Sequence, residues 1–312
     1  MHKMEMVQKH IPVMLNEVLE NLALKDGGLY VDATFGFGGY TSAILEEKNC
    51  RVISLDRDPD VLPRANEIKQ KYPLRFEFKQ SCFSRLAELI SEPVDGVVFD
   101  IGVSSMQIDE AKRGFSFSKE ARLDMRMSQS GLSAYDIVNT ASEEELADIL
   151  YQFGEEKKSR QIAKKIVSKR ALKPIETTTE LAEIVYEVIF KKAGQLDPAT
   201  RTFQALRIAV NDELKELEKG LEAAKAVLKP EGRLVVVDFH SLEDRIVKNF
   251  FKQNGPKKVH VSRYAKEAFK ENTPFSYVSE VIAPSKEEIL INSRAHSAKL
   301  RFGIKAKGEH HG

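Results

Sequence analysis

Short apolar runs alternate with helical patterns through the first third of the sequence. This alternation is typical of βαβ units, and it predicts a parallel sheet with helices on its faces. The fourth apolar run has almost no polar residue before Asp100, as expected for a strand buried on both faces. The expected strands are residues 28–36, 50–58, 75–81 and 94–105, and the expected helices between them are residues 41–48 and 60–71.

The pattern changes between residues 106 and 199, where polar loops and amphipathic helices replace the strands. Residues 157–173 carry eight Lys or Arg and no acid, and their spacing predicts a helix with Ile162, Ile166 and Val167 on its inner face. Gly154 is expected just beyond the end of an earlier helix, as its C-terminal cap. Two of the helices begin with a capping box, in which Ser or Thr precedes Glu by three residues: Ser142 with Glu145, and Thr177 with Glu180.

The α/β pattern resumes after Pro198. A long helix is expected from about residue 200 to 228, followed by a strongly apolar strand in 229–239 and a helix over 242–251. Two further strands, 276–283 and 297–305, are expected to pair antiparallel because the segment between them is short for a helical crossover. The predicted fold is therefore an α/β, Rossmann-like core with a mostly parallel sheet. We expect this core to comprise residues 1–105 and 200–312, with an all-helical domain of residues 106–199 inserted in it.

Composition narrows the function classes. The 312 residues carry a formal net charge of +1, so binding to nucleic acid must come from local basic patches. Two cysteines, Cys50 and Cys82, with no CxxC spacing disfavour a disulfide framework or a cysteine zinc site. No run of about 18 apolar residues occurs. These observations predict a soluble, cytoplasmic protein with no membrane partner.

A glycine-rich turn lies between the first strand and the first helix, in VDATFGFGGYTSAILE (31–46). Gly36 and Gly38 match the first two glycines of the dinucleotide pattern G-x-G-x-x-G, but Thr41 replaces the third. The loop allows close backbone approach without a pyrophosphate grip, which fits S-adenosylmethionine (SAM) better than NAD. Asp32, just before the loop, is expected to meet the ammonium group of SAM directly or through water.

Acids also end the second and fourth strands. Asp56 is expected to accept both hydroxyls of a ribose, with a helix-capping role as the alternative. Asp100 lies at the switch point of the predicted sheet, where cofactor and substrate meet, and its alternative role is to cap the next turn.

A series of longer motifs runs from His10 to Arg301. In chain order they are HIPVML, ATFGFGGYT, LDRDP, FDIGVSS, RGFSF, LDMRM, ATRTFQALRIAVNDEL, GRLVVVDFHSLEDRIVK and SRAHSAKLR. Together they closely resemble the bacterial 16S rRNA cytosine-N4 methyltransferase family (RsmH, also called MraW), and the resemblance covers nearly the whole chain. It implies a class I SAM-dependent methyltransferase fold with an inserted helical domain. The implied activity is methylation of the exocyclic N4 of cytidine 1402 in the small-subunit rRNA, near the decoding site.

The resemblance also implies site residues. Tyr40 stands where many members carry His, so only a backbone contact is transferred to this position. A lone aromatic after a strand is more often core, but the resemblance assigns Phe83 to the cofactor, where it would stack on adenine. Transferred motif by motif, the SAM contacts fall on Gly38, Gly39, Tyr40, Asp56, Phe83, Asp100 and Gln107.

Asp100 is the predicted catalytic residue: it, or a backbone carbonyl just after it, accepts a hydrogen bond from the target amine or helps to fix SAM. His240 is a candidate for base or phosphate contacts, and capping of the following helix is an equally weighted alternative. A metal site built from His240, Glu243 and Asp244 is disfavoured. The rRNA is expected to bind the basic segment 157–173, with phosphate contacts added by Arg113, Arg126, Arg294 and Arg301. The candidate substrate contacts are Ser104, Ser105, Arg113, His240 and Ser241.

Two rival functions remain open at this level. One is a non-catalytic rRNA-binding or assembly factor that kept the fold, which the near-complete set of cofactor residues disfavours. The other is a methyltransferase acting on a protein or small molecule, which the basic helical segment disfavours.

Overall fold

The structure, a computed structural model, describes residues 12–191, 194–256 and 273–307. The chain divides into two compact units. Residues 1–102 and 216–312 form the first, which we call the sheet unit, and residues 103–215 form the second, the helical unit.

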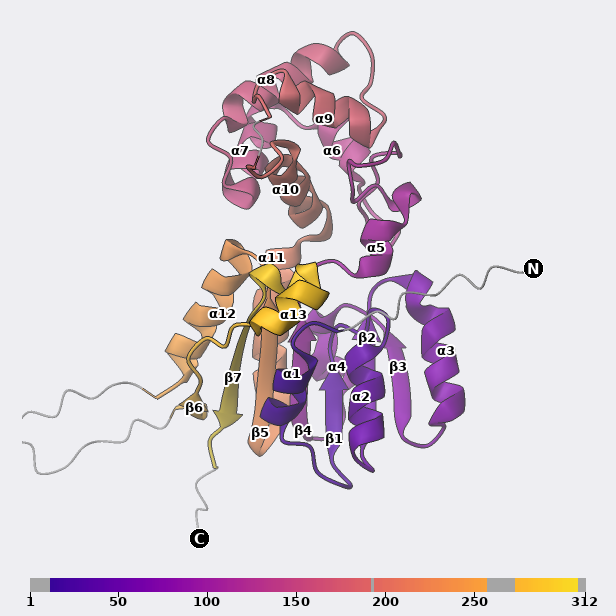
Figure 1. Cartoon of the computed structure of the whole chain (residues 1–312), viewed down its shortest axis with the longest axis vertical. Coiled ribbons are helices and arrows are strands. Elements are labelled where there is room, and N and C mark those ends of the chain that lie inside the picture. Colours follow the sequence, from indigo (N-terminus) through magenta and orange to yellow (C-terminus); the bar gives the residue numbers. More distant parts are fainter. Residues whose placement is uncertain (1–11, 192–193, 257–272, 308–312) are drawn as a thin grey trace, which may run out of the picture. The chain divides into compact units, whose positions relative to one another are not determined.

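The sheet unit contains a seven-stranded sheet in the order β3-β2-β1-β4-β5-β7-β6 (Figure 1). The first five strands of this order are parallel, whereas β7 is antiparallel to both β5 and β6. This confirms the predicted mixed sheet and the antiparallel pair at its C-terminal end. The strands are β1 (Leu29–Asp32), β2 (Arg51–Asp56), β3 (Phe76–Gln80), β4 (Val94–Asp100), β5 (Leu228–Asp238), β6 (Phe275–Val278) and β7 (Lys299–Lys305).

Helices flank this sheet, and apolar side chains of its central strands, such as Val97, Phe99 and Val236, form the core beneath them. The α-helices are α1 (Leu15–Leu22), α2 (Gly39–Glu47), α3 (Leu62–Lys71), α4 (Leu86–Leu89), α11 (Glu213–Val227, whose first turn belongs to the helical unit), α12 (Ser241–Asn254) and α13 (Lys286–Ile291). The 3₁₀ turns are η1 (Pro59–Val61), η2 (Phe83–Arg85) and η4 (Ser293–Ser297).

The helical unit has its own apolar core, in which Leu150, Ile162, Leu181 and Phe203 are buried. Both predicted capping boxes are present. The described residues of this unit form no strand, only an isolated bridge between Arg122 and Thr177. Its helices are α5 (Ser105–Asp109), η3 (Ala111–Arg113), α6 (Ala134–Thr140), α7 (Glu143–Gly154), α8 (Ser159–Arg170), α9 (Thr178–Tyr186) and α10 (Ala199–Asn211).

The expected long helix from 200 to 228 is wrong. α10 ends at Asn211, and Asp212 adopts a left-handed conformation (φ 51°) before α11 begins. The Asn211 side chain accepts a hydrogen bond from Met127 N and donates to Met125 O, which fixes the end of α10 inside the helical unit. The helical unit covers residues 103–215, and the expected insertion of residues 106–199 lies within it.

Two smaller expectations also need correction. Gly154 is the last residue of α7, and the left-handed cap is Glu155 (φ 50°). The connection between β6 and β7 contains the short helix α13. Among the described residues, no helix is long and apolar enough to cross a membrane.

Candidate active site

Four neighbouring parallel strands of the sheet unit end in aspartate. In the order β2, β1, β4 and β5 these are Asp56, Asp32, Asp100 and Asp238. Because the carboxyl ends of parallel strands meet at one edge, they form a row of carboxylates where ligands of open α/β sheets bind. Asp32 and Asp238 are 0 % exposed, whereas Asp56 and Asp100 are half-buried. Asp56 and Asp100 therefore keep part of their surface exposed at this edge.

Burial raises the pKa of all four carboxyls. The pKa of Asp32 and that of Asp56 rise to about 6, and that of Asp238 to about 7. The pKa of Asp100 rises furthest, to about 8, because the carboxylates of Asp32 and Glu243 add to the effect of burial. A nearby positive charge would reverse these shifts, so this edge of the sheet favours a cationic ligand.

The loop between β1 and α2 is held against the end of β2. Gly36 and Gly38 have positive φ (51° and 73°), and a Cβ on Gly38 would lie 2.7 Å from Ile68 Cδ1. Asp56 Oδ2 accepts a hydrogen bond from Gly36 N (2.8 Å), and Oδ1 accepts one from Asp58 N (2.9 Å). A carboxylate has about four acceptor positions, so each oxygen of Asp56 retains capacity for a ligand hydroxyl.

Asp32 anchors the loop from inside. Its Oδ2 accepts a hydrogen bond from Thr41 Oγ1 (2.7 Å), and its Oδ1 accepts one from Thr34 N (3.2 Å). Thr41 Oγ1 also lies 2.7 Å from Ser54 Oγ on β2. Because Asp32 is fully enclosed, its observed bonds position α2 and the loop, and of the two expected ligand contacts the direct one is disfavoured by its burial.

Asp100 has a different set of contacts. Its backbone N donates to Thr34 Oγ1 (2.7 Å), which ties the end of β4 to the glycine loop. Its Oδ1 is buried and has no hydrogen-bond partner in the described part of the chain. Burying such an atom unpaired costs about 1–3 kcal/mol, so its presence points to a partner group that a ligand brings.

Phe83 begins η2, directly after β3. Its ring packs edge-to-face on Phe99, with centroids 5.4 Å apart and an interplanar angle of 87°. Gly220 on α11 leaves room for the ring, because a Cβ there would lie 2.5 Å from Phe83 Cδ2. The side chain rests on the core but is only partly buried, so part of the ring remains accessible to a planar group.

Tyr40 turns its side chain inward. The residue is 3 % exposed, and its hydroxyl donates to Val13 O. Burial, followed by the nearby carboxylates of Asp100 and Asp32, raises the pKa of Tyr40 well above its ordinary value. The Tyr40 ring thus packs inside the sheet unit, and only the backbone of this residue is left to contact a ligand.

His240 caps α12. Its Nδ1 accepts a hydrogen bond from Glu243 N (3.4 Å), while Glu243 Oε2 accepts from His240 N (3.2 Å) in a reciprocal capping box. The structure therefore shows the capping role, and Ser241 is the first residue of the helix. Asp244 pairs instead with Lys299 and Arg301. No group of three His, Cys, Asp or Glu residues in the described chain is arranged for a metal ion.

The remaining candidates belong to the helical unit. Ser104 and Gln107 form the capping box of α5, in which Ser104 N donates to Gln107 Oε1 (3.0 Å) and Gln107 N donates to Ser104 Oγ (3.3 Å). Ser105 is the first residue of that helix. Arg113 is 5 % exposed and donates to the carbonyls of Arg126 (2.9 Å) and Met127 (3.1 Å). A phosphate contact by Arg113 would require these bonds to break.

The other arginines proposed for phosphate contacts differ in exposure. Arg301 is inside the sheet unit, 11 % exposed, and pairs with Asp244 and Asp238, which corrects the expected phosphate contact. Arg126 pairs with Asp124 (2.8 Å) and keeps 29 % of its side chain exposed. Arg294, in η4, is exposed.

The basic segment forms α8, with Ile162 and Ile166 buried as predicted. Part of its charge is neutralised within the unit: Lys165 and Lys169 both pair with Glu187, and Lys173 pairs with Glu180. In contrast, four exposed cations of the segment have no ion-pair partner among the residues the structure describes: Lys157, Lys158, Arg160 and Lys164. Of these, Lys158 donates a hydrogen bond to Val188 O (3.0 Å).

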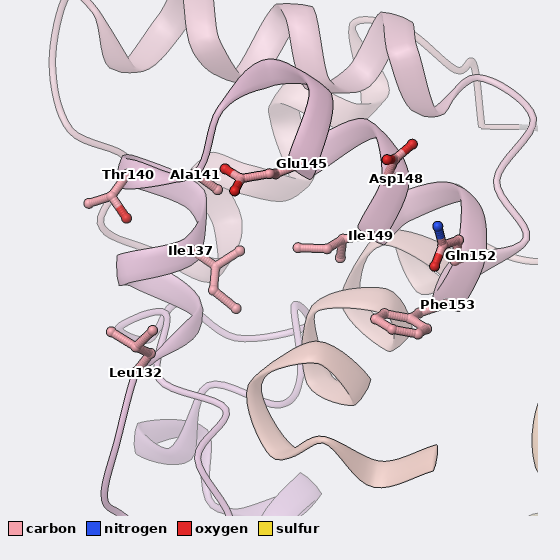
Figure 2. Close-up of a pocket in the computed structure, with 9 residues that line it drawn as sticks. All are labelled: Leu132, Ile137, Thr140, Ala141, Glu145, Asp148, Ile149, Gln152 and Phe153. Carbon is pink, nitrogen blue, oxygen red and sulfur yellow. The ribbon is translucent and has the colours of Figure 1, made fainter. Parts of the chain in front are cut away.

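An open groove of about 500 Å³ lies elsewhere on the helical unit (Figure 2). Leu132, Ile137, Ile149 and Phe153 supply apolar side chains to it, and carboxylates and amides form its polar part. The acids in this lining, Glu145 and Asp148, are exposed. These carboxylates would repel a polyanion.

Sequence reasoning missed two residues that hold the site. Thr34 and Ser54 bond to site groups, and nothing but their proximity to strand ends signals this role. Glu243, Ser104 and Gln107 were named from the sequence, but not as members of capping boxes, which the spacings H-S-L-E and S-S-M-Q would have indicated.

The fold and the site together define a class of protein. A doubly wound sheet with an antiparallel β7, a glycine loop after β1, and carboxylates at the ends of β2 and β4 form a Rossmann-like methyltransferase whose cofactor is SAM. The residues fit this cofactor, because the unpartnered Asp100 oxygen and the raised carboxyl pKa values suit a ligand with an ammonium and a sulfonium charge.

Comparison with known proteins gives the family. The model described as the MraW methylase family matches residues 7–306, so the chain belongs to the MraW methylase family. The chain is 55 % identical over 300 residues to Ribosomal RNA small subunit methyltransferase H of Rickettsia massiliae (strain Mtu5). The alignment covers 95 % of this chain and 98 % of that protein. The protein of the same name from Rickettsia felis is 54 % identical over 304 residues, or 96 % and 99 % of the two chains. A crystal structure of an rRNA methylase from Streptococcus thermophilus aligns with a TM-score of 0.44 at 10 % identity, over 96 % and 99 % of the two chains.

Proposed function

We propose that the protein transfers the methyl group of SAM to the exocyclic N4 of cytidine 1402 in 16S rRNA. The observation that carries the proposal is the half-buried Asp100, whose Oδ1 lacks a partner among the described residues while its backbone is tied to the glycine loop. An amine hydrogen of the substrate or the charge of the cofactor would satisfy this oxygen. The relatives named above support small-subunit rRNA as the substrate, and that substrate implies a cytoplasmic location.

In this proposal, five positions of the sheet unit hold the cofactor. Asp56 accepts hydrogen bonds from the two ribose hydroxyls. It does so at the acceptor positions that its bonds to Gly36 N and Asp58 N leave free. The accessible part of Phe83 lies against the adenine, and the backbone of Gly38, Gly39 and Tyr40 follows the amino-acid end. Gln107, with its side-chain oxygen engaged by Ser104 N, is assigned by resemblance alone.

Bound SAM supplies an electrophilic methyl group. The chain's task is to align a weak nucleophile, because the N4 lone pair of cytosine is delocalised into the ring. Asp100 accepts a hydrogen bond from N4–H, and this bond directs the N4 lone pair towards the methyl carbon. The Asp100 carboxylate then takes the proton that N4 loses. Alignment of this kind contributes about 7–11 kcal/mol in favourable systems, enough to carry most of the acceleration.

The target cytidine must leave any stack to reach the carboxyl edge of the sheet, because chemistry on a base requires an unstacked nucleotide. Ser104, Ser105, Arg113, His240 and Ser241 remain candidates for contacts to it. Of these, His240 and Arg113 would have to leave the capping and loop contacts described above to bind RNA directly.

Mapping of methylated 16S rRNA tests the proposal directly. Small subunits lacking the modification, incubated with the protein and SAM, should gain one methyl group on N4 of cytidine 1402, read by mass spectrometry of nuclease fragments. Methylation of another nucleotide, or of protein alone, would contradict it.

SAM binding should depend on pH because Asp100 is protonated at neutral pH in the free protein. Its pKa of about 8 must fall when a cation binds beside it, so binding at pH 7 should release close to one proton. The affinity should rise about tenfold per pH unit up to about pH 8 and then level off. Calorimetry at pH 7 in buffers of different ionisation enthalpy measures the proton count. Asp100→Asn should remove this release, and unchanged release in that variant would assign it to another group.

The rRNA should bind through exposed cations at the start of the basic segment that have no ion-pair partner among the described residues, Lys157, Arg160 and Lys164. Replacing Lys157, Arg160 and Lys164 by Ala should weaken binding at least about tenfold, and the slope of log K against log salt should become shallower by about 2. Filter binding of a 16S rRNA fragment between low and high salt gives both values. The matched control replaces three exposed lysines of the sheet unit: Lys219, Lys248 and Lys252. Equal losses in both triple variants would show a non-specific charge effect instead.

A further inference from the structure

The segment just before α1 packs on the glycine loop. Pro12 lies directly against Gly39, since a Cβ on that glycine would come within 2.3 Å of Pro12 Cγ. Val13 and Met14 follow and are buried. The chain then enters α1 through Met14, which has a left-handed conformation (φ 53°). A segment of three residues thus packs on the glycine loop, which the proposed function assigns to SAM.

Two side chains secure this segment at its backbone. The Tyr40 hydroxyl donates to Val13 O, and Met14 N donates to Glu288 Oε1 on α13. The contacts come from opposite ends of the sheet unit's sequence, because Tyr40 follows β1 and Glu288 precedes β7. Together with Pro12 on Gly39, they join three separate parts of the chain at one place.

The same phenol lies within electrostatic reach of the candidate site. The carboxylates of Asp100, Asp32 and Glu288 all contribute to the raised pKa of Tyr40. The tyrosine thus bonds the segment 12–14 through its hydroxyl, while its own backbone belongs to the loop.

We propose that Tyr40 is a positioning residue that fixes Pro12–Met14 as an outer wall of the SAM site. Its phenol acts on the segment, and not on the cofactor. The docked Pro12 in turn holds Gly39 and the start of α2 in the conformation that SAM requires. Pro12 can pack here only because Gly39 has no side chain. Gly39, the second glycine of the G-G pair, therefore has a packing role that is separate from phosphate binding.

The test compares two buried tyrosines. Tyr40→Phe removes the hydroxyl that holds Val13, whereas Tyr30→Phe removes a hydroxyl that accepts from Lys25 N (2.7 Å), a contact outside the site. Each variant loses one hydrogen bond of a buried phenol, so both should lower the unfolding midpoint. Tyr40→Phe alone should raise the Kd and the KM for SAM, about three- to tenfold, with kcat at saturating SAM unchanged.

A second variant acts on the wall from its other side. Glu288→Ala removes the acceptor of Met14 N without touching the loop, and it should raise the Kd for SAM in the same direction. Hydrogen exchange at the Met14 amide should be faster in both variants and should slow when SAM is added.

The outcomes are distinct. If Tyr40→Phe and Glu288→Ala lower the unfolding midpoint as Tyr30→Phe does but leave the Kd for SAM unchanged, the segment is only packing and the proposal falls. If kcat drops while KM stays constant, Tyr40 acts on the reaction itself and the positioning role is wrong. Because SAM binding is measured without RNA, neither result depends on which nucleotide is methylated.

Discussion

Asp100→Asn should reduce kcat/KM for methyl transfer by about 100- to 1000-fold, the loss typical of removing one electrostatic contact made in the transition state. The substitution keeps the shape of the side chain and its backbone bond to Thr34, but it removes the ionisable carboxyl that burial has left without a partner among the described residues. An amide also places an N–H donor in a position where the proposed amine needs an acceptor. Steady-state rates with 16S rRNA as substrate, together with the Kd for SAM by calorimetry, measure the effect.

Asp95→Asn is the matched control, because Asp95 lies on the same strand near its other end. Its carboxylate pairs with Lys229 (2.7 Å) and accepts from Leu29 N (2.9 Å), away from the proposed site. Turnover of this variant should stay near the wild-type value. A fall in kcat with unchanged SAM affinity would assign Asp100 to the amine, and a rise in the Kd for SAM would assign it to the cofactor. Full turnover with unchanged affinity in Asp100→Asn would exclude both roles.

The sheet was predictable from the sequence because its strands are short apolar runs with sharp polar ends. β4, for example, is apolar from Gly96 to Phe99 and ends at Asp100, so the pattern predicts both its burial and its end. The break at Asp212 was not predictable in the same way. Residues 199–227 have continuous helical periodicity, and what ends α10 is a tertiary contact, the bonds of Asn211 to the loop at Met125 and Met127.

The site residues, too, were predictable where the local sequence determines their place and unpredictable where tertiary contacts do. Strand-end acids such as Asp56 and Asp100 are visible in sequence because parallel strands bring their carboxyl ends together. Which of the four faces a ligand depends on burial, and only the structure shows that Asp32 is enclosed by Thr41 and Thr34. Likewise, Arg301 and Arg126 look alike in sequence, yet one lies in a buried ion cluster and the other is partly exposed.

That buried cluster leads to the largest expected effect on stability. Asp238, at the end of β5, is 0 % exposed, and neither of its oxygens has a hydrogen-bond partner in the described part of the chain. The Arg301 Nη1 atom lies 3.6 Å from its Oδ2, and the same guanidinium bonds Asp244. Removing one partner of a buried ion pair typically costs about 3–5 kcal/mol, because the other charge is left uncompensated. Arg301→Met, which keeps the length of the side chain, should therefore lower the free energy of unfolding by about this amount.

The pH dependence of this loss identifies its cause. The pKa of Asp238 is about 7 in the folded protein, above its ordinary value of about 4. Between these two values the unfolded state ionises more readily than the folded state, so the free energy of unfolding falls as pH rises. Arg301 limits that loss by lowering the pKa, so in Arg301→Met the pKa should rise further and extend the loss above pH 7. Urea unfolding at pH 6 and pH 8.5 should show the larger difference from wild type at pH 8.5. Arg51→Met, which breaks the exposed pair with Glu92 (2.7 Å, side chains about half exposed), should cost no more than about 1 kcal/mol at either pH. An Arg301→Met cost as small as that of Arg51→Met would show that Asp238 stays protonated without help from the guanidinium.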